Sequence, residues 1–240
     1  MADLAKQLEA RLRAVGTAER AASEQRYLKS DLTFLGTTVW QIRSAVRELA
    51  APMDHDALVA QVADLWSAPV FERRMAAVLL LDRGARDLAG GDLSLIERLV
   101  RESRTWALVD GLAGDVLGTM VERDPVGTRD DLDRWATDDD FWVRRASLLA
   151  ELKPIRHGAP LDRFAARADP MLEEREFFIR KAIGWVLREA GKRRPDDVAA
   201  WVAPRTHRAS GVTMREAVKY LPPEVGRRLI SAYRAGQPAN

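Results

Sequence analysis

One acidic residue stands in an otherwise apolar stretch with helical spacing, TWALVDGLAGDVLG at residues 105–118. Trp106 and Asp110 are four residues apart, so a helix would present both side chains on one face. A carboxylate beside an indole on a packing face loses solvation, and some interaction must offset that cost. Two readings are open: a functional carboxylate, or a buried acid that a neighbouring arginine or backbone NH satisfies.

Dibasic pairs recur in three helix-like segments, FERRMAAVLLL (71–81), FWVRRASLLAEL (141–152) and FFIRKAIGWVL (177–187). The pairs Arg73-Arg74, Arg144-Arg145 and Arg180-Lys181 are in register, separated by 71 and then 36 residues. Seventy-one is close to twice 36, which indicates a helical-pair repeat of about that length. A missing copy should begin near Thr105, at the stretch that holds Asp110.

The repeat makes Asp110 unusual, because Ala146 and Ala182 occupy the equivalent positions. Small residues at such positions are suited to packing against a neighbouring helix. The same copy replaces the dibasic pair by Leu108-Val109. A departure of this kind from the pattern of sibling repeats favours a functional role.

The elements that position these residues are all predicted to be helices. Segments throughout the chain space apolar residues by three and four, and short breaks with Gly, Pro, Asp or Ser separate them. The sequence therefore predicts an all-α fold, an α-solenoid of HEAT-like helical-hairpin repeats with a concave basic face. We expect one repeat domain over residues 1–240, with a divergent helical part at 1–26.

Charge and composition narrow the function. Residues 171–240 hold 14 Lys/Arg against 8 Asp/Glu, although the whole chain has a net charge of only +2. A ladder of dibasic pairs along one face would suit a regular polyanion such as duplex DNA. The alternative is that each pair is a solvated face or an inter-repeat ion pair. There is no cysteine and no histidine cluster among the three histidines, so we expect no metal site and a cytoplasmic protein.

Five segments together resemble a known family, the AlkD-type DNA alkylation repair glycosylases, which are built from HEAT-like repeats. The resemblance runs from about Tyr27 to about Leu221. Its marks are YLKSDLTFLG (27–36), TWALVD (105–110), FWVRRASLLAELK (141–153), FFIRKAIGWVLRE (177–189) and REAVKYLP (215–222). Trp40 departs from the pattern, because the family often has a proline there.

The resemblance implies roles for individual residues. Asp110 falls on the family's catalytic aspartate, and Trp106 and Trp185 fall on two tryptophans that line the deoxyribose of the lesion. Tyr27 matches an aromatic residue near the same site, and Arg145 matches an arginine that grips the DNA backbone. Trp185 has an ordinary alternative as a core residue. The predicted DNA-binding set is completed by the other basic residues of the repeats, Arg74, Arg144, Arg180 and Lys181.

The resemblance also implies an activity, hydrolysis of the N-glycosidic bond of cationic N3- or N7-alkylated purines in duplex DNA. It implies recognition through sugar and backbone, without base flipping. If the base stays in the stack, we expect bulky adducts to be tolerated, and we expect no metal or organic cofactor. No lysine adjoins Asp110 in the sequence, so we expect a monofunctional enzyme without a lyase step. We expect a monomer that contacts DNA and no membrane, in the cytoplasm at the nucleoid. The alternative is a non-catalytic HEAT-repeat scaffold that binds DNA or protein.

Overall fold

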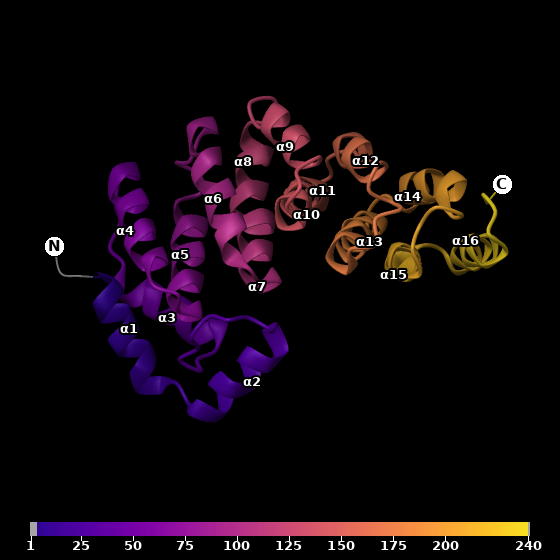
Figure 1. Cartoon of the computed structure of the whole chain (residues 1–240). Coiled ribbons are helices and arrows are strands. Elements are labelled where there is room, and N and C mark those ends of the chain that lie inside the picture. The colour runs from indigo at the N-terminus through magenta and orange to yellow at the C-terminus, as the bar shows by residue number, and fades with distance from the viewer. Residues whose placement is uncertain (1–3, 240) are drawn as a thin grey trace. The chain divides into compact units, whose positions relative to one another are not determined.

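The structure is a computed structural model that describes residues 4–239 (Figure 1). Its regular elements are helices, and within those residues no β-strand forms; an isolated bridge pairs Thr33 with Val70. The helices gather into two compact units, Met1–Met120 and Val121–Asn240. The all-α fold class expected from the sequence is confirmed. The single domain over 1–240 stays a prediction.

The first unit begins with α1 (Leu4–Val15) and α2 (Ala18–Leu28), which make up most of the segment expected to be divergent. The other elements of this unit are α3 (Val39–Leu49), α4 (His55–Ser67), α5 (Phe71–Gly84), η1 (Gly90–Asp92), α6 (Leu93–Ser103), α7 (Trp106–Asp110) and the π-helical η2 (Gly111–Leu117). Helix α8 (Gly118–Arg123) follows η2 directly and runs across the boundary between the two units. Helix α5 packs against α3, α4 and η2, and Figure 1 shows it between neighbouring helices.

The second unit contains α9 (Arg129–Trp135), α10 (Phe141–Leu149), α11 (Leu152–Arg156), α12 (Asp162–Ala168), α13 (Phe177–Gly191), α14 (Pro195–Val202), η3 (Ala203–Arg205), α15 (Gly211–Ala217), η4 (Val218–Tyr220) and α16 (Pro223–Ala235). Helix α13 packs against both α10 and α15 (Figure 1). Its buried positions include Ala182, Ile183 and Val186, all inaccessible to solvent. It is the central helix of this unit.

Side chains at the helix N-termini explain several of the boundaries. Asp140 caps α10 by accepting from the Trp142 NH at 2.8 Å, and Glu176 caps α13 by accepting from the Phe178 NH. At α3, Thr38 and Gln41 form a capping box, in which the Thr38 hydroxyl accepts from the Gln41 NH at 3.1 Å. Each cap satisfies an NH that the helix leaves without a carbonyl partner.

The repeat of about 36 residues is visible in the structure. Helices α5, α10 and α13 begin at Phe71, Phe141 and Phe177, each within one residue of the register that the dibasic pairs set. Polar side-chain contacts also recur at this separation. Trp66 bonds to Glu102 at 2.8 Å, and Arg205 bonds to Asp169 at 3.1 Å, each 36 residues away. In both contacts a side chain bonds to the residue one repeat length away, as stacked helical repeats allow.

Two classes of site find no support among residues 4–239. No helix in that range combines the length and the apolarity needed to cross a bilayer. No group of three His, Cys, Asp or Glu side chains in the same range is arranged to hold a metal ion.

Candidate functional site

Tyr27 and Trp106 come together in the first unit. Tyr27 lies in the last turn of α2, and Trp106 is the first residue of α7. Their rings meet edge to face, with centroids 5.8 Å apart and an interplanar angle of 87°. Tyr27 is 71% exposed and Trp106 is half-buried, so this aromatic pair lies at the surface. Exposed aromatic surface held in a fixed geometry is suited to contact with a ligand.

Asp110 ends α7, one helical turn after Trp106, so the two side chains share a face as the spacing predicted. Asp110 is half-buried, whereas Ala146 and Ala182 of the equivalent positions are inaccessible to solvent. The register therefore overstated how deeply this acid is packed. The residues of α7 that are buried are Leu108 and Val109. Asp110 thus keeps part of its surface exposed to solvent.

The helix that carries Asp110 changes form immediately after it. Residues Gly111–Leu117 form a π-helical segment, and the chain returns to α-helix at Gly118. A side chain at Gly111 would meet Val78 of α5, since an added Cβ would lie 2.8 Å from the Val78 Cγ1. Insertions of this kind widen a helix locally and are frequent at functional sites. Sequence periodicity did not reveal it.

A buried carboxylate fixes the loop after Tyr27. Glu72, at the start of α5, is inaccessible to solvent, and its oxygens accept from the backbone NH groups of Leu35, Gly36 and Thr37 at 2.9, 2.8 and 3.3 Å. Phe34 also stacks on Phe71, with centroids 5.0 Å apart. The motif YLKSDLTFLG is thus anchored to α5, and this anchorage positions the end of α2. Glu72 is a positioning residue that the sequence analysis missed.

Two residues beside the aromatic pair have a strained backbone. Lys29 and Arg104 are the non-glycine residues with positive φ among residues 4–239, at 49° and 50°. Lys29 follows Tyr27 by two positions, and Arg104 precedes Trp106 by two. Side chains other than glycine adopt this region at a cost of about 1–3 kcal/mol, and such strain clusters at functional sites. Both residues lie within two positions of the Tyr27–Trp106 pair.

Arg145 lies in the second unit on α10 and is buried, at 3% exposure. Its Nη1 donates to the carbonyl oxygen of Phe178 on α13 at 2.6 Å, and its guanidinium lies over the Phe178 ring. Phe141, Trp142 and Phe178 form an aromatic cluster above this contact, with Trp142 and Phe178 centroids 4.8 Å apart. Arg145 therefore joins two successive repeats.

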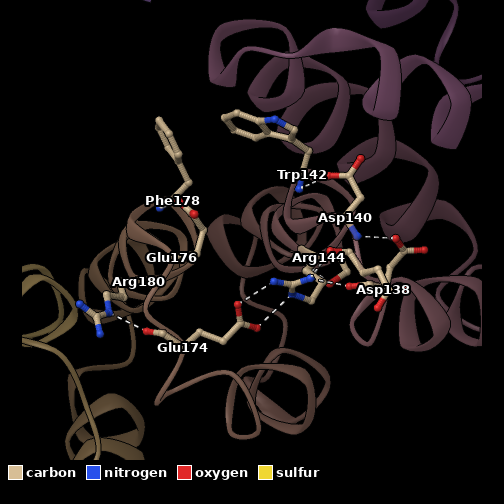
Figure 2. A network of polar contacts seen from close by, with 10 residues as sticks. Asp138, Asp140, Trp142, Arg144, Glu174, Glu176, Phe178 and Arg180 are labelled. Atoms are coloured by element: carbon tan, nitrogen blue, oxygen red, sulfur yellow. Dashed lines mark hydrogen bonds and ion pairs between the residues drawn. The ribbon is translucent and has the colours of Figure 1, made fainter. Parts of the chain in front are cut away.

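Arg144 also connects the two repeats (Figure 2). Its Nε and Nη2 donate to the two carboxylate oxygens of Glu174 at 3.0 and 2.8 Å, a bidentate pair, and Nη1 donates to the Asp139 carbonyl. The Arg144 side chain is mostly buried, so this ion pair is better shielded than an exposed one. In the protein without DNA, Arg144 therefore forms an ion pair between repeats, which is one of the alternatives that the sequence left open for the dibasic pairs.

The other predicted cations have partners too. Arg180 donates from Nε to the Glu174 carbonyl at 2.6 Å (Figure 2), and Lys181 forms an ion pair with Glu216. Burial alone would raise the pKa of Glu216, but the hydrogen bond from Lys181 and the charge of Arg188 bring that pKa below its ordinary value. Lys181 keeps about two fifths of its side chain exposed, more than Arg144 or Arg145.

The predicted site residues thus form two groups. Tyr27, Trp106 and Asp110 assemble in the first unit, where Arg74 also lies. The second unit holds Trp185, half-buried on α13 one turn after Lys181, together with the remaining cations. The DNA-binding role of these cations, and the pairing of Trp185 with Trp106 around one sugar, stay predictions.

We expect Arg145→Ala to destabilise the second unit by about 1–3 kcal/mol, because it leaves the Phe178 carbonyl without its buried donor. Chemical denaturation followed by tryptophan fluorescence measures this loss. The salt dependence of duplex binding tests the second role of Arg145. If it neutralises a phosphate, the slope of log affinity against log salt falls by about 0.9. Wild-type stability in the variant would contradict the Phe178 contact.

Comparisons with known proteins place this geometry in context. A family model described as "DNA alkylation repair enzyme" matches residues 8–221. A comparison with curated proteins finds no match. Among solved structures, a predicted DNA alkylation repair enzyme from Enterococcus faecalis aligns with a TM-score of 0.76 and 21% identity, over 87% of this chain and 97% of that one.

A second solved structure, AlkD2 from Streptococcus mutans, aligns with a TM-score of 0.62 and 17% identity, over 84% of this chain and 99% of that one. At these identities the structures establish a shared fold, the helical-repeat solenoid class. The family match covers nearly the whole chain, including the Tyr27, Trp106 and Asp110 segments. The chain therefore belongs to the DNA alkylation repair enzyme family.

Proposed function

We propose that the protein is a monofunctional DNA glycosylase that hydrolyses the N-glycosidic bond of cationic N3- or N7-alkylated purines in duplex DNA. The observation that carries the proposal is the geometry of the first unit. A half-buried acid, Asp110, stands one helical turn from Trp106, and Tyr27 contacts the indole at the surface. Membership of a DNA alkylation repair family supports the same substrate class.

The carboxylate acts on the charge that develops on the sugar. Breaking the glycosidic bond gives deoxyribose oxocarbenium character at C1′, and a fixed carboxylate nearby stabilises this positive charge. The interaction is stronger where DNA excludes water from the half-buried Asp110 than it would be in bulk solvent. The same carboxylate can orient the attacking water or accept its proton.

The aromatic residues hold the sugar. The face of an indole carries negative quadrupole density, which attracts a group that is gaining positive charge. Trp106 supplies such a face from the first unit, and its contact with Tyr27 fixes the orientation of the ring. We assign Trp185 of the second unit a contact with the deoxyribose as well, as the family resemblance implies.

The alkylated base can leave without protonation by the enzyme. A purine alkylated at N3 or N7 carries a formal positive charge, so it departs as a neutral molecule and requires no general acid. Recognition through sugar and phosphate would leave the base in the stack, in contrast to enzymes that flip the base into a pocket. No cofactor has a part in this reaction.

The direct test is incubation of the protein with a duplex containing 7-methylguanine, followed by chromatography of the released material. We expect free 7-methylguanine and an abasic strand that remains uncleaved until it is treated with alkali. Strand cleavage without alkali would indicate a lyase step and contradict the monofunctional assignment. Duplex binding without any released base would favour the non-catalytic scaffold instead.

A further inference from the structure

A surface cavity of about 330 Å³ lies in the first unit beside the proposed site, where three arginines converge. Arg74, Arg101 and Arg104 line it together with two acids, Asp31 and Glu102. Arg104 is two residues before Trp106, and Asp31 is four residues after Tyr27. The cavity therefore adjoins both segments that carry the aromatic pair.

The two acids differ in how far they neutralise the positive charge of the arginines. Glu102 accepts a hydrogen bond from the Trp66 indole NH at 2.8 Å, so part of its capacity is already used. Asp31 pairs with Arg104 at 3.3 Å, but the side chains are 71% and 70% exposed. An ion pair so exposed contributes about 0–1 kcal/mol and exchanges readily for a competing anion. The Arg104 guanidinium is thus available to a ligand.

Arg74 has unused hydrogen-bonding capacity. Its Nη1 donates to the Glu102 carbonyl at 2.7 Å and its guanidinium lies 5.0 Å from the Trp66 ring centre, but its buried Nε has no partner within residues 4–239. Burial lowers the pKa of Arg74; the charge of Glu102 opposes this effect, and the positive charge of Arg104 adds to it. The two guanidiniums repel each other, and an anion between them would relieve this repulsion.

We propose that this cavity binds a backbone phosphate of the DNA strand that carries the lesion, with Arg104 as its principal ligand and Arg74 behind it. The assignment rests on the proposed glycosylase function for the identity of the strand. Two residues of chain span at most about 7 Å, and an arginine side chain adds reach. Arg104 can therefore meet a phosphate next to the nucleotide whose sugar contacts Trp106.

The closing experiment compares variants of opposite expected sign. Binding of the full-length protein to undamaged duplex is measured over a range of KCl concentrations. Arg104→Gln should weaken binding and lower the log–log salt slope by about 0.9, the value for one phosphate. Asp31→Asn should tighten binding at low salt, because it removes the acid that competes for Arg104. Arg86→Gln, an exposed arginine beyond the opposite end of α5, is the matched control and should change neither quantity.

A structural role alone would make Arg104→Gln and Asp31→Asn shift affinity in the same direction. That result would overturn the proposal, as would a wild-type salt slope in Arg104→Gln.

Duplexes with a single neutral methylphosphonate linkage then locate the phosphate. One linkage near 7-methylguanine should weaken wild type but not Arg104→Gln. Release of 7-methylguanine is scored separately. A protein that shows the slope change but releases no base would retain the phosphate site and lose the glycosylase assignment.

Discussion

Asp110→Asn should slow release of 7-methylguanine by about 10²–10³-fold, the usual loss when a preorganised group that stabilises transition-state charge is removed. The substitution keeps the size of the side chain and removes its negative charge, which is the property that the oxocarbenium-like sugar requires. Duplex affinity should stay near wild type, because Asp110 acts on charge that develops only in the transition state. Single-turnover rates at saturating enzyme, with affinity measured in parallel, give both values.

Asp115→Asn is the matched control for this variant. Asp115 is an exposed acid five residues further along the same continuous helical stretch, and it lies in the π-helical segment. Loss of one carboxylate there changes the net charge by the same amount and should leave excision unaffected. Equal rate losses in the two variants would indicate a general electrostatic effect on DNA binding, and a wild-type rate in Asp110→Asn would remove Asp110 from the reaction.

The sequence predicted the helical repeat well, because the repeat depends on local periodicity. Phe71, Phe141 and Phe177 each begin a helix, within one residue of the register that the dibasic pairs indicated. The same register was a poor guide to burial at Asp110, because it assumed that every copy packs as a full helix. The helix passes from α7 into a π-helical segment directly after Asp110, and this change has no signature in apolar spacing.

Long-range polar contacts were the other part that the sequence could not supply. Arg145 reads as an exposed cation in a dibasic pair, but it is buried against Phe178 of the next repeat. Glu72 reads as an ordinary surface acid, but it is fully buried beneath three backbone NH groups. Burial of a charged group is decided by the partner that compensates it, and the partner here lies more than 30 residues away. Conversely, Arg104 carries no motif, yet it is among the most exposed cations near Trp106.

The lesions that the enzyme accepts depend on which part of the nucleotide the protein stabilises and which part must leave unaided. If Asp110 stabilises only the sugar, the leaving-group quality must come from the lesion itself. We expect release of 7-methylguanine and of a bulky N3-adenine adduct, both of which carry a positive charge on the purine. Neutral 1,N6-ethenoadenine should be released more slowly by about 10²–10⁴-fold, the contribution that a general acid would otherwise make. Quantification of free base from the three lesions in one duplex context measures this order.

The bulky adduct separates the two parts of this mechanism. An enzyme that holds the sugar at the Tyr27–Trp106 surface and leaves the base stacked has no pocket that limits adduct size. The charge of the adduct should therefore affect the rate of base release more than its size does. The bulky cationic adduct should be released faster than the small neutral one. Asp110→Asn should slow both cationic lesions by a similar factor, because the sugar is the same in each. Rapid release of ethenoadenine by the wild-type protein would mean that a protein group activates the base, and the sugar-centred mechanism would then be wrong.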